Sequence, residues 1–269
     1  TGYMLSFCFN KNKQIGVKEV HIKEKKLIDG TYEMQDAIDI DWEYPTSSVA
    51  GIESDPSDRT NLTLFCQELK ERMKEYRDDL ILSIAITAST RYYDLAALNN
   101  YVGFFNVMTY DFAMGTKAQH NSALYTTIAS PSSLDASVGL VSKYVDNDKI
   151  IPGAAFYIRK GTFSNGVSQQ LGSSLKTSMG SGSMTFANLM NLIKNNDQYT
   201  EQYDENAKAA YIICDNVFYS YDNVQSIKDK CQYVKDNNLA GLMCWELTQD
   251  YIDDNGVAIL VNAMYESLK

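Results

Sequence analysis

The sequence contains few residues of the types that build metal centres and disulfide frameworks. Its 269 residues include five cysteines and two histidines. The cysteines are widely scattered, without a CxxC pair or a cysteine–histidine cluster. This spacing argues against structural zinc, and no disulfide pairing can be read from it. We therefore expect each cysteine to be a small buried apolar residue.

Long apolar runs and an excess of positive charge are missing as well. No stretch of the sequence approaches the roughly 18 consecutive apolar residues of a membrane span, and the N-terminus carries no charged-then-apolar leader. Acidic residues outnumber basic ones by 34 to 24, which gives a formal net charge of -10. Such a charge repels phosphate backbones. The sequence predicts a soluble domain that binds neither a membrane nor a nucleic acid.

Apolar and aromatic residues, in contrast, are plentiful. The hydrophobic content of 45% is enough for a substantial core, and the length suits one large α/β domain or two small ones. Nineteen tyrosines accompany only two tryptophans. Flat rings that also carry hydroxyl groups suit sugar binding, although most tyrosines of any domain are packing residues. Composition alone therefore favours a carbohydrate ligand only weakly.

Predicted strands alternate with predicted amphipathic helices along most of the chain. The expected strands are residues 3–10, 36–44, 80–87, 104–110, 149–157 and 239–246. The expected helices are 58–76, 93–101, 134–145, two that follow Thr185 and Asp222, and 257–268. Near-continuous apolar strands between such helices are typical of a parallel sheet that is covered on both faces. Residues 160–184 are rich in glycine and serine without a clear period, which indicates an insertion.

The predicted strand 36–44 carries three carboxylates on one side. Side chains on one face of a strand recur at every second position, so Asp39, Asp41 and Glu43 lie about 7 Å apart in succession. Like charges this close cannot all be ionised, so at least one carboxyl pKa is raised. These residues predict a proton-transfer site in which Glu43, kept neutral by its neighbours, donates a proton.

Two other interpretations of the three carboxylates were weighed. A solvated edge strand is disfavoured, because apolar residues occupy the opposite face and a proline ends the run. A metal site formed by the three carboxylates stays open, because spacing alone does not separate it from a proton-transfer site.

The acidic run also resembles a known signature. Asp36-Ala-Ile-Asp39-Ile-Asp41-Trp-Glu43 resembles the DxxDxDxE motif of glycoside hydrolase family 18, the chitinases and their relatives. Other segments resemble the family in its own order: Met108-Thr-Tyr110-Asp111, His120–Tyr125, Phe156-Tyr157-Ile-Arg159, Tyr203–Lys208, Tyr221-Asp222 and Gly241–Leu247. The resemblance runs from about residue 36 to 269.

The resemblance implies a (β/α)8 TIM barrel with its site at the carboxyl ends of the strands. Residues 1–269 would form one catalytic domain, with a small insertion subdomain at 160–210 between strands 7 and 8. The family has three strands before the acidic one, whereas only 35 residues precede it here and Thr1 is no initiator methionine. We therefore expect an N-terminally incomplete barrel whose first two strands are missing.

The resemblance also implies a catalytic set. Glu43 would protonate the glycosidic oxygen and later activate water. Asp41 would hold the N-acetyl group of the substrate, and Asp39 would share a proton with Asp41. Tyr110 would hydrogen-bond the acetamide, whose own oxygen acts as the nucleophile, a known exception to the two-carboxylate scheme.

A further set would bind the sugar. Trp245 would form an apolar floor under the ring, although a core position is its alternative, and Arg159 is either a site or ion-pair residue or a surface charge. His120 is expected to be a hydrogen-bonding residue of its loop rather than a base, because Glu43 already supplies proton transfer, and Tyr92 and Tyr93 either line the site or pack. The other predicted binding residues are Asp111, Met108, Tyr157 and Tyr44, and Asp36 is expected to be a structural residue of the motif.

These implications lead to one functional hypothesis and its alternatives. The expected activity is that of a retaining glycoside hydrolase that cleaves β-1,4 linkages of N-acetylglucosamine polymers such as chitin. A lectin-like sugar-binding protein on the same fold, an endo-β-N-acetylglucosaminidase that acts on glycan cores, and a metal-dependent hydrolase stay open. By resemblance we expect a secreted monomer that binds chitin or a related oligosaccharide and uses no cofactor and no metal ion.

Overall fold

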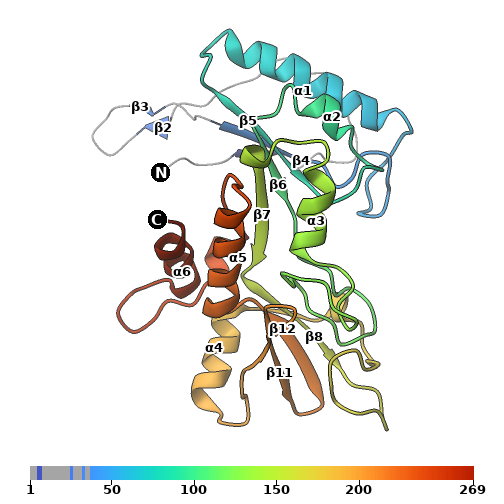
Figure 1. The fold of residues 1–269 in the computed structure, drawn as a ribbon, viewed down its shortest axis with the longest axis vertical. Helices are drawn as coiled ribbons and strands as arrows, with labels where there is room; N and C mark the ends of the chain where they lie inside the picture. Colours follow the sequence, from blue (N-terminus) through green and yellow to red (C-terminus); the bar gives the residue numbers. More distant parts are fainter. Residues whose placement is uncertain (1–4, 8–24, 27–31, 34–36) are drawn as a thin grey trace. The chain divides into compact units, whose positions relative to one another are not determined.

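A computed structural model describes residues 5–7, 25–26, 32–33 and 37–269 of the chain (Figure 1). The described residues form two compact units. The first comprises those up to Asn106 together with Val141–Ile150, and the second comprises Val107–Leu140 and Ile151–Lys269. The predicted residue Asp36 lies outside the described residues.

The first unit is built on parallel strands. They are β1 (Leu5–Phe7), β4 (Ala37–Asp41), β5 (Ile81–Ile86) and β6 (Phe104–Val107), hydrogen-bonded as neighbours in that order. Strand β4 runs parallel to both β1 and β5, with Asp39 opposite Ser6 on one side and Ser83 on the other. Because parallel strands point the same way, their carboxyl ends meet at one edge. A short antiparallel pair, β2 (Lys25–Lys26) and β3 (Tyr32–Glu33), completes the strands described before residue 37.

Helix α1 (Asp58–Lys74) follows the acidic strand, as its apolar spacing predicts. Its buried side consists of Leu62, Cys66, Leu69 and Met73. Tyr76, the last residue of the predicted helix 58–76, lies beyond the end of α1 and is 56% exposed, so the predicted end of this helix is wrong. Short helices α2 (Leu95–Leu98) and η1 (Asn147–Lys149) are the others in this unit.

Parallel strands continue in the second unit. Strand β13 (Met243–Trp245) pairs in parallel with β7 (Ile150–Ala155), with Met243 opposite Gly153 and Trp245 opposite Ala155. The helices of the second unit are α3 (Leu134–Val141), α4 (Phe186–Asn195), α5 (Val224–Asp236), α6 (Ile259–Leu268) and the single turns η2 (Met179–Ser181) and η3 (Leu247–Gln249). Helices α5 and α6 pack against each other.

Capping explains where two of these helices begin. The Thr185 side chain accepts a hydrogen bond from the Asn188 amide, as expected of the residue that starts α4. Asn223 and Ser226 form a reciprocal capping box at the start of α5. The predicted alternation of strands and helices is therefore confirmed as an α/β fold with parallel strands, while the described residues do not show an eight-stranded barrel.

A five-stranded antiparallel sheet is formed by strands between residues 157 and 221. It includes part of the segment 160–184, for which the sequence showed no clear period. Its order is β10 (Gln202–Asp204), β11 (Ala209–Cys214), β12 (Val217–Tyr221), β8 (Tyr157–Thr162) and β9 (Ser183–Thr185). The hairpin between β11 and β12 turns at Asp215 and Asn216, both with positive φ, as two-residue turns prefer. The sheet begins before and ends after the insertion predicted at 160–210, which stays a prediction.

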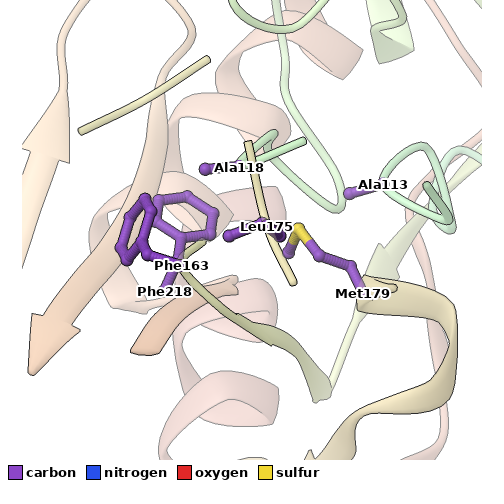
Figure 2. Close-up of a cluster of buried hydrophobic side chains, with 6 residues drawn as sticks. All are labelled: Ala113, Ala118, Phe163, Leu175, Met179 and Phe218. Carbon is purple, nitrogen blue, oxygen red and sulfur yellow. The ribbon is translucent and has the colours of Figure 1, made fainter. Parts of the chain in front are cut away.

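A hydrophobic cluster joins this sheet to the segment that follows β6 (Figure 2). Phe163 and Phe218 meet edge to face with ring centroids 6.3 Å apart. Their buried neighbours are Ala113, Ala118, Leu175 and Met179. The cluster thereby holds the chain immediately after Asp111 against the sheet.

The described cysteines are unpaired. Cys66, Cys214 and Cys231 are buried and Cys244 is half-buried, which agrees with their predicted role as small core residues; Cys8 lies outside the described residues. None of the helices in the described part of the chain combines the length and apolar character needed to cross a bilayer.

Candidate active site

Strand β4 places two carboxylates of the predicted site at the centre of the first unit. Asp39 is 5% exposed, and its Oδ1 accepts hydrogen bonds from Ser83 Oγ at 2.6 Å and Asn106 Nδ2 at 2.9 Å. The alternate residues Ile38 and Ile40 are buried on the other side, as the period of the strand predicts. The edge-strand interpretation is therefore wrong, because β4 has a partner on each side.

The electrostatics of this strand follow from burial and crowding. Burial raises the pKa of Asp39, although its bonds from Ser83 and Asn106 act in the opposite direction. Burial, and then the charges of Glu43 and Asp39, raise the pKa of Asp41 to about 6. Asp41 Oδ1 is buried and has no hydrogen-bond partner among the described residues. The prediction that at least one of these carboxyls has a raised pKa is confirmed, and Asp41 is able to change its charge near neutral pH.

Tyrosines lie next to the carboxylates. Tyr44, which follows Glu43, stacks on Tyr92 with ring centroids 5.2 Å apart, and Tyr93 meets Tyr92 edge-on at 6.1 Å. Tyr93 is 1% exposed, and burial, with smaller contributions from Tyr44, Glu43 and Asp41, raises its pKa. Of the two open positions, Tyr93 therefore packs in the core, whereas the half-exposed Tyr92 extends the ring surface of Tyr44.

A second group of predicted residues gathers in the second unit around Asp111. Asp111 Oδ1 accepts hydrogen bonds from Tyr157 OH at 2.7 Å and Arg159 Nε at 2.8 Å. The Arg159 guanidinium also lies 5.1 Å from the centroid of the Tyr157 ring. Tyr110 meets Tyr157 edge-on, with centroids 6.0 Å apart. Arg159 is thus an ion-pair residue of this group, and its interpretation as a free surface charge is wrong.

Trp245 stands at the end of β13 with 53% of its surface exposed. Its carbonyl accepts a hydrogen bond from the Phe156 amide at 2.8 Å, which ties it to the segment that carries Tyr157. The alternative that Trp245 is a core residue is therefore wrong. Met108, the remaining predicted binding residue, is half-buried just beyond β6.

His120 is fully buried, and its Nε2 lies 3.1 Å from Asp204 Oδ2. This hydrogen bond is the first cause of the lowered pKa of Asp204. The ring also meets Tyr211 edge-on at 5.7 Å. His120 therefore joins its loop to β10, the hydrogen-bonding role that the sequence predicted. Within the described ranges, no group of three or more histidine, cysteine, aspartate or glutamate side chains is arranged to hold a metal ion.

The family assignment follows from a comparison with protein-family models. The model of the glycosyl hydrolases family 18 matches residues 23–250. The chain belongs to glycosyl hydrolase family 18. Among similar proteins, chitinase A1 of Niallia circulans is 32% identical over 246 residues, 80% of this chain and 35% of that protein. Chitinase 1 of Yersinia entomophaga is 32% identical over 262 residues, 86% of this chain and 47% of that protein. The chain thus spans about a third to a half of the length of these relatives.

Solved structures of an N-acetylglucosaminidase and of a chitinase share the fold. The N-acetylglucosaminidase of Paenibacillus barengoltzii matches with a TM-score of 0.78 at 35% identity, over 87% of this chain and 71% of that one. Chitinase ChiW from Paenibacillus sp. str. FPU-7 matches with a TM-score of 0.79 at 32% identity, over 87% of this chain and 28% of that one. The described α/β fold is therefore that of the family 18 chitinase structures.

Other residues, which the sequence patterns did not reveal, hold the predicted ones in place. Ser83 and Asn106 bind Asp39, and each is the one polar residue of its observed strand, β5 for Ser83 and β6 for Asn106. An isolated polar residue in a buried strand needs a hydrogen-bond partner, and this was the available signal. Lys230, which is fully buried on α5 and binds Asp222, was missed as well, because it lies in the sequence beside the charged residues Lys228 and Asp229.

Proposed function

We propose that this chain carries the catalytic machinery of a retaining glycoside hydrolase that cleaves β-1,4 linkages of N-acetylglucosamine polymers such as chitin. The observation that carries this proposal is the row of carboxylates Asp39, Asp41 and Glu43, which begins on β4 and continues just beyond its end. Asp41, with a pKa of about 6, lies in the chain between Asp39, which is buried, and Glu43. Membership of family 18 and similarity to chitinases support the choice of substrate.

The proposed reaction has two steps, both using Glu43. In the first, Glu43 donates its proton to the glycosidic oxygen as the bond from that oxygen to the anomeric carbon breaks. The acetamide oxygen of the substrate attacks the anomeric carbon and forms an oxazolinium ion. In the second step Glu43 removes a proton from water, which opens this ion at the anomeric carbon. Two inversions at one carbon give net retention.

Asp41 and Asp39 support the charge that develops during the first step. Ionised Asp41 would accept the acetamide N–H and stabilise the positive oxazolinium ion. Its pKa of about 6 allows it to take a proton from, or return it to, a neighbouring carboxyl near neutral pH. Asp39, held by Ser83 and Asn106, is the proposed partner in this exchange.

The substrate-binding residues are assigned by resemblance to the family. We assign Tyr110 to the acetamide and the exposed ring of Trp245 to the apolar face of the sugar. Asp111, oriented by Tyr157 and Arg159, would accept hydrogen bonds from sugar hydroxyls. Met108 and Tyr44 are the remaining proposed contacts.

Comparing Glu43→Gln with wild type tests the proposed function. Hydrolysis of chitin oligosaccharides should fall by about 10²–10⁴-fold, the usual contribution of a general acid–base group. Glu53→Gln, in an exposed loop of the same unit, is the matched control and should keep the wild-type rate. NMR of the first product should show the β-anomer. Equal rates for Glu43→Gln and wild type, or an α-anomer product, would overturn the proposal.

An N-acetylglucosaminidase activity is the second candidate, and one observation favours it. The 35% identical structure from Paenibacillus barengoltzii is described as an N-acetylglucosaminidase. Product analysis separates the two activities, because a chitinase releases oligosaccharides from the polymer and an N-acetylglucosaminidase releases the monosaccharide. A protein that binds these sugars with no turnover, and whose binding is unchanged in Glu43→Gln, would instead support the lectin-like alternative.

A further inference from the structure

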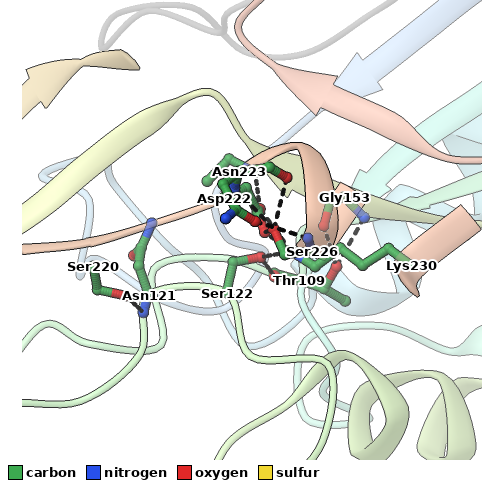
Figure 3. Close-up of polar contacts among 10 residues, drawn as sticks. Thr109, Asn121, Ser122, Gly153, Ser220, Asp222, Asn223, Ser226 and Lys230 are labelled. Carbon is green, nitrogen blue, oxygen red and sulfur yellow. Dashed lines mark hydrogen bonds and ion pairs between the residues drawn. The ribbon is translucent and has the colours of Figure 1, made fainter. Parts of the chain in front are cut away.

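A fully buried ion pair lies at the centre of a polar network in the second unit (Figure 3). Lys230 on α5 is 0% exposed, and Asp222, just before this helix, is 1% exposed. Lys230 Nζ lies 2.6 Å from each oxygen of Asp222 and 2.7 Å from Ser122 Oγ. Burial lowers the pKa of Lys230, and the adjacent Asp222 acts against this shift. The three acceptor atoms match in number the three N–H donors of the ammonium group.

One branch of the network ends next to Tyr110. Ser122, which accepts from Lys230, donates through its Oγ to the Thr109 carbonyl at 2.8 Å. Thr109 is bound in turn to β7: its Oγ1 donates to the Gly153 carbonyl at 2.7 Å and accepts from the Gly153 amide at 2.8 Å. The residue immediately before Tyr110 is therefore fixed by both its carbonyl and its side chain.

The other branch ends next to Trp245. Asp222 Oδ2 accepts a hydrogen bond from the Ala155 amide at 2.9 Å. Ala155 is the residue of β7 opposite Trp245, and the next amide along the chain, that of Phe156, donates to the Trp245 carbonyl. Asp222 Oδ1 meanwhile accepts from Ser226 Oγ at 2.8 Å, so the start of α5 is held as well.

Both branches reach strand β7, one at Gly153 and the other at Ala155, and the Tyr110 ring packs on this strand. A Cβ atom added at Gly153 would lie 2.6 Å from Tyr110 Cε1 and 3.0 Å from Met243 Cε. The Tyr110 ring therefore lies directly on β7 at Gly153. Met243, the residue of β13 opposite Gly153, lies beside it. A shift of the Thr109 segment relative to β7 would move this ring.

A buried ion pair contributes little net stability, because the desolvation of both charges offsets their attraction. What this pair does provide is orientation, since its hydrogen bonds connect α5 with Ser122 and with the Ala155 amide of β7. We propose that Lys230 and Asp222 are positioning residues of the proposed active site, which set the place of Tyr110 relative to β7 and Trp245. This inference rests on the proposed function.

The first test is kinetic and uses Ser122→Ala, a small change that removes the link to Thr109. We expect kcat to fall by about tenfold with KM within about twofold, because a misplaced acetamide contact affects the transition state more than the bound substrate. Ser137→Ala is the matched control, since this buried serine also donates to a backbone carbonyl, that of Ser133 at 2.8 Å, inside α3. Equal kinetics for the two variants would overturn the proposal.

A double-mutant cycle distinguishes positioning from general weakening of the fold. In a Tyr110→Phe background, Ser122→Ala should reduce kcat by less than about twofold further, because the group it positions is already absent. Losses that simply multiply would show that Ser122 acts elsewhere, and would overturn the proposal.

Amide hydrogen exchange provides a test that does not need activity. Lys230→Met and Ser122→Ala should increase exchange in peptides that cover residues 107–112 and 153–157, whereas Ser137→Ala should leave both at the wild-type rate. Unchanged exchange in both variants would refute the positioning role. If the wild-type protein hydrolyses no substrate but exchange responds as expected, the proposed function fails while the positioning of these segments stands.

Discussion

Replacing Asp41 by asparagine should stabilise the protein at neutral pH and leave its stability unchanged in acid. The pKa of Asp41 rises from its ordinary value of 3.8 to about 6 in the folded chain, mainly through burial and then through Glu43 and Asp39. A folded-state pKa above the unfolded one means that ionisation costs the native state free energy. This cost is absent below about pH 4, grows between pH 4 and pH 6, and is complete above pH 6.

The size of the effect follows from the shift. At about 1.4 kcal/mol for each pH unit, the difference between the folded and unfolded pKa values corresponds to about 3 kcal/mol. Asp41 is only half-buried, so water screens part of this cost, and we expect roughly 1–2 kcal/mol at pH 8. Asparagine has nearly the same shape and no charge, so it removes this cost at every pH.

Urea unfolding followed by tryptophan fluorescence, at pH 4 to 8 in steps of one unit, measures the effect. The difference in unfolding free energy between Asp41→Asn and wild type should be near zero at pH 4 and reach its full value by pH 7. Asp55→Asn is the control, because hydrogen bonds from Ser57 lower the pKa of Asp55 and favour its charged form. Its stability difference should not become more favourable as the pH rises. A flat or falling difference for Asp41→Asn would refute the electrostatic reasoning.

Further predictions concern packing in the second unit. Gly153→Ala should reduce activity by about tenfold, because the new methyl would lie 2.6 Å from the Tyr110 ring and displace it. Gly139→Ala should instead stabilise α3 by about 0.5–1 kcal/mol, because nothing in the described part of the chain lies within 4 Å of the new methyl. Thermal unfolding and oligosaccharide hydrolysis of the two variants check this contrast, and equal activities would contradict it. Phe218→Ala should lower the unfolding free energy by about 3–5 kcal/mol, since Phe218 is fully buried against Phe163, and a loss below about 1 kcal/mol would show that the site can collapse around the missing ring.

Local patterns predicted the elements whose period is regular. The apolar residues of β4 recur at every second position, and those of α1 recur at every third or fourth position. Both elements were therefore predicted, and each buries its apolar face. In the antiparallel sheet, β9 and β10 have three residues each and β8 contains glycine, which is too little for an alternation to be recognised. Strands β11 and β12 were missed although they are largely apolar runs of six and five residues. Such strands form because neighbouring strands pair with them, and pairing partners are not visible in a local window.

In the candidate site, too, local patterns predicted some residues and left the long-range contacts unpredicted. The order of residues on a strand was enough to place Asp39 and Asp41 together, but not to find what holds them. Asn106 reaches Asp39 across 67 positions of the sequence, and Arg159 reaches Asp111 across 48. Contacts at such separations depend on strand register and loop path, which single-sequence patterns do not determine.

The buried cysteines give each compact unit its own chemical reporter. Cys66 on α1 and Cys231 on α5 are both 0% exposed, and burial raises the pKa of their thiols to about 12 and about 11. Alkylating reagents attack a thiolate that solvent can reach, so neither residue reacts while its helix stays packed. The alkylation rate at each position, read from its own peptide by mass spectrometry, therefore reports how often that helix opens, and a ligand bound to one unit will be seen in the rate of its own cysteine.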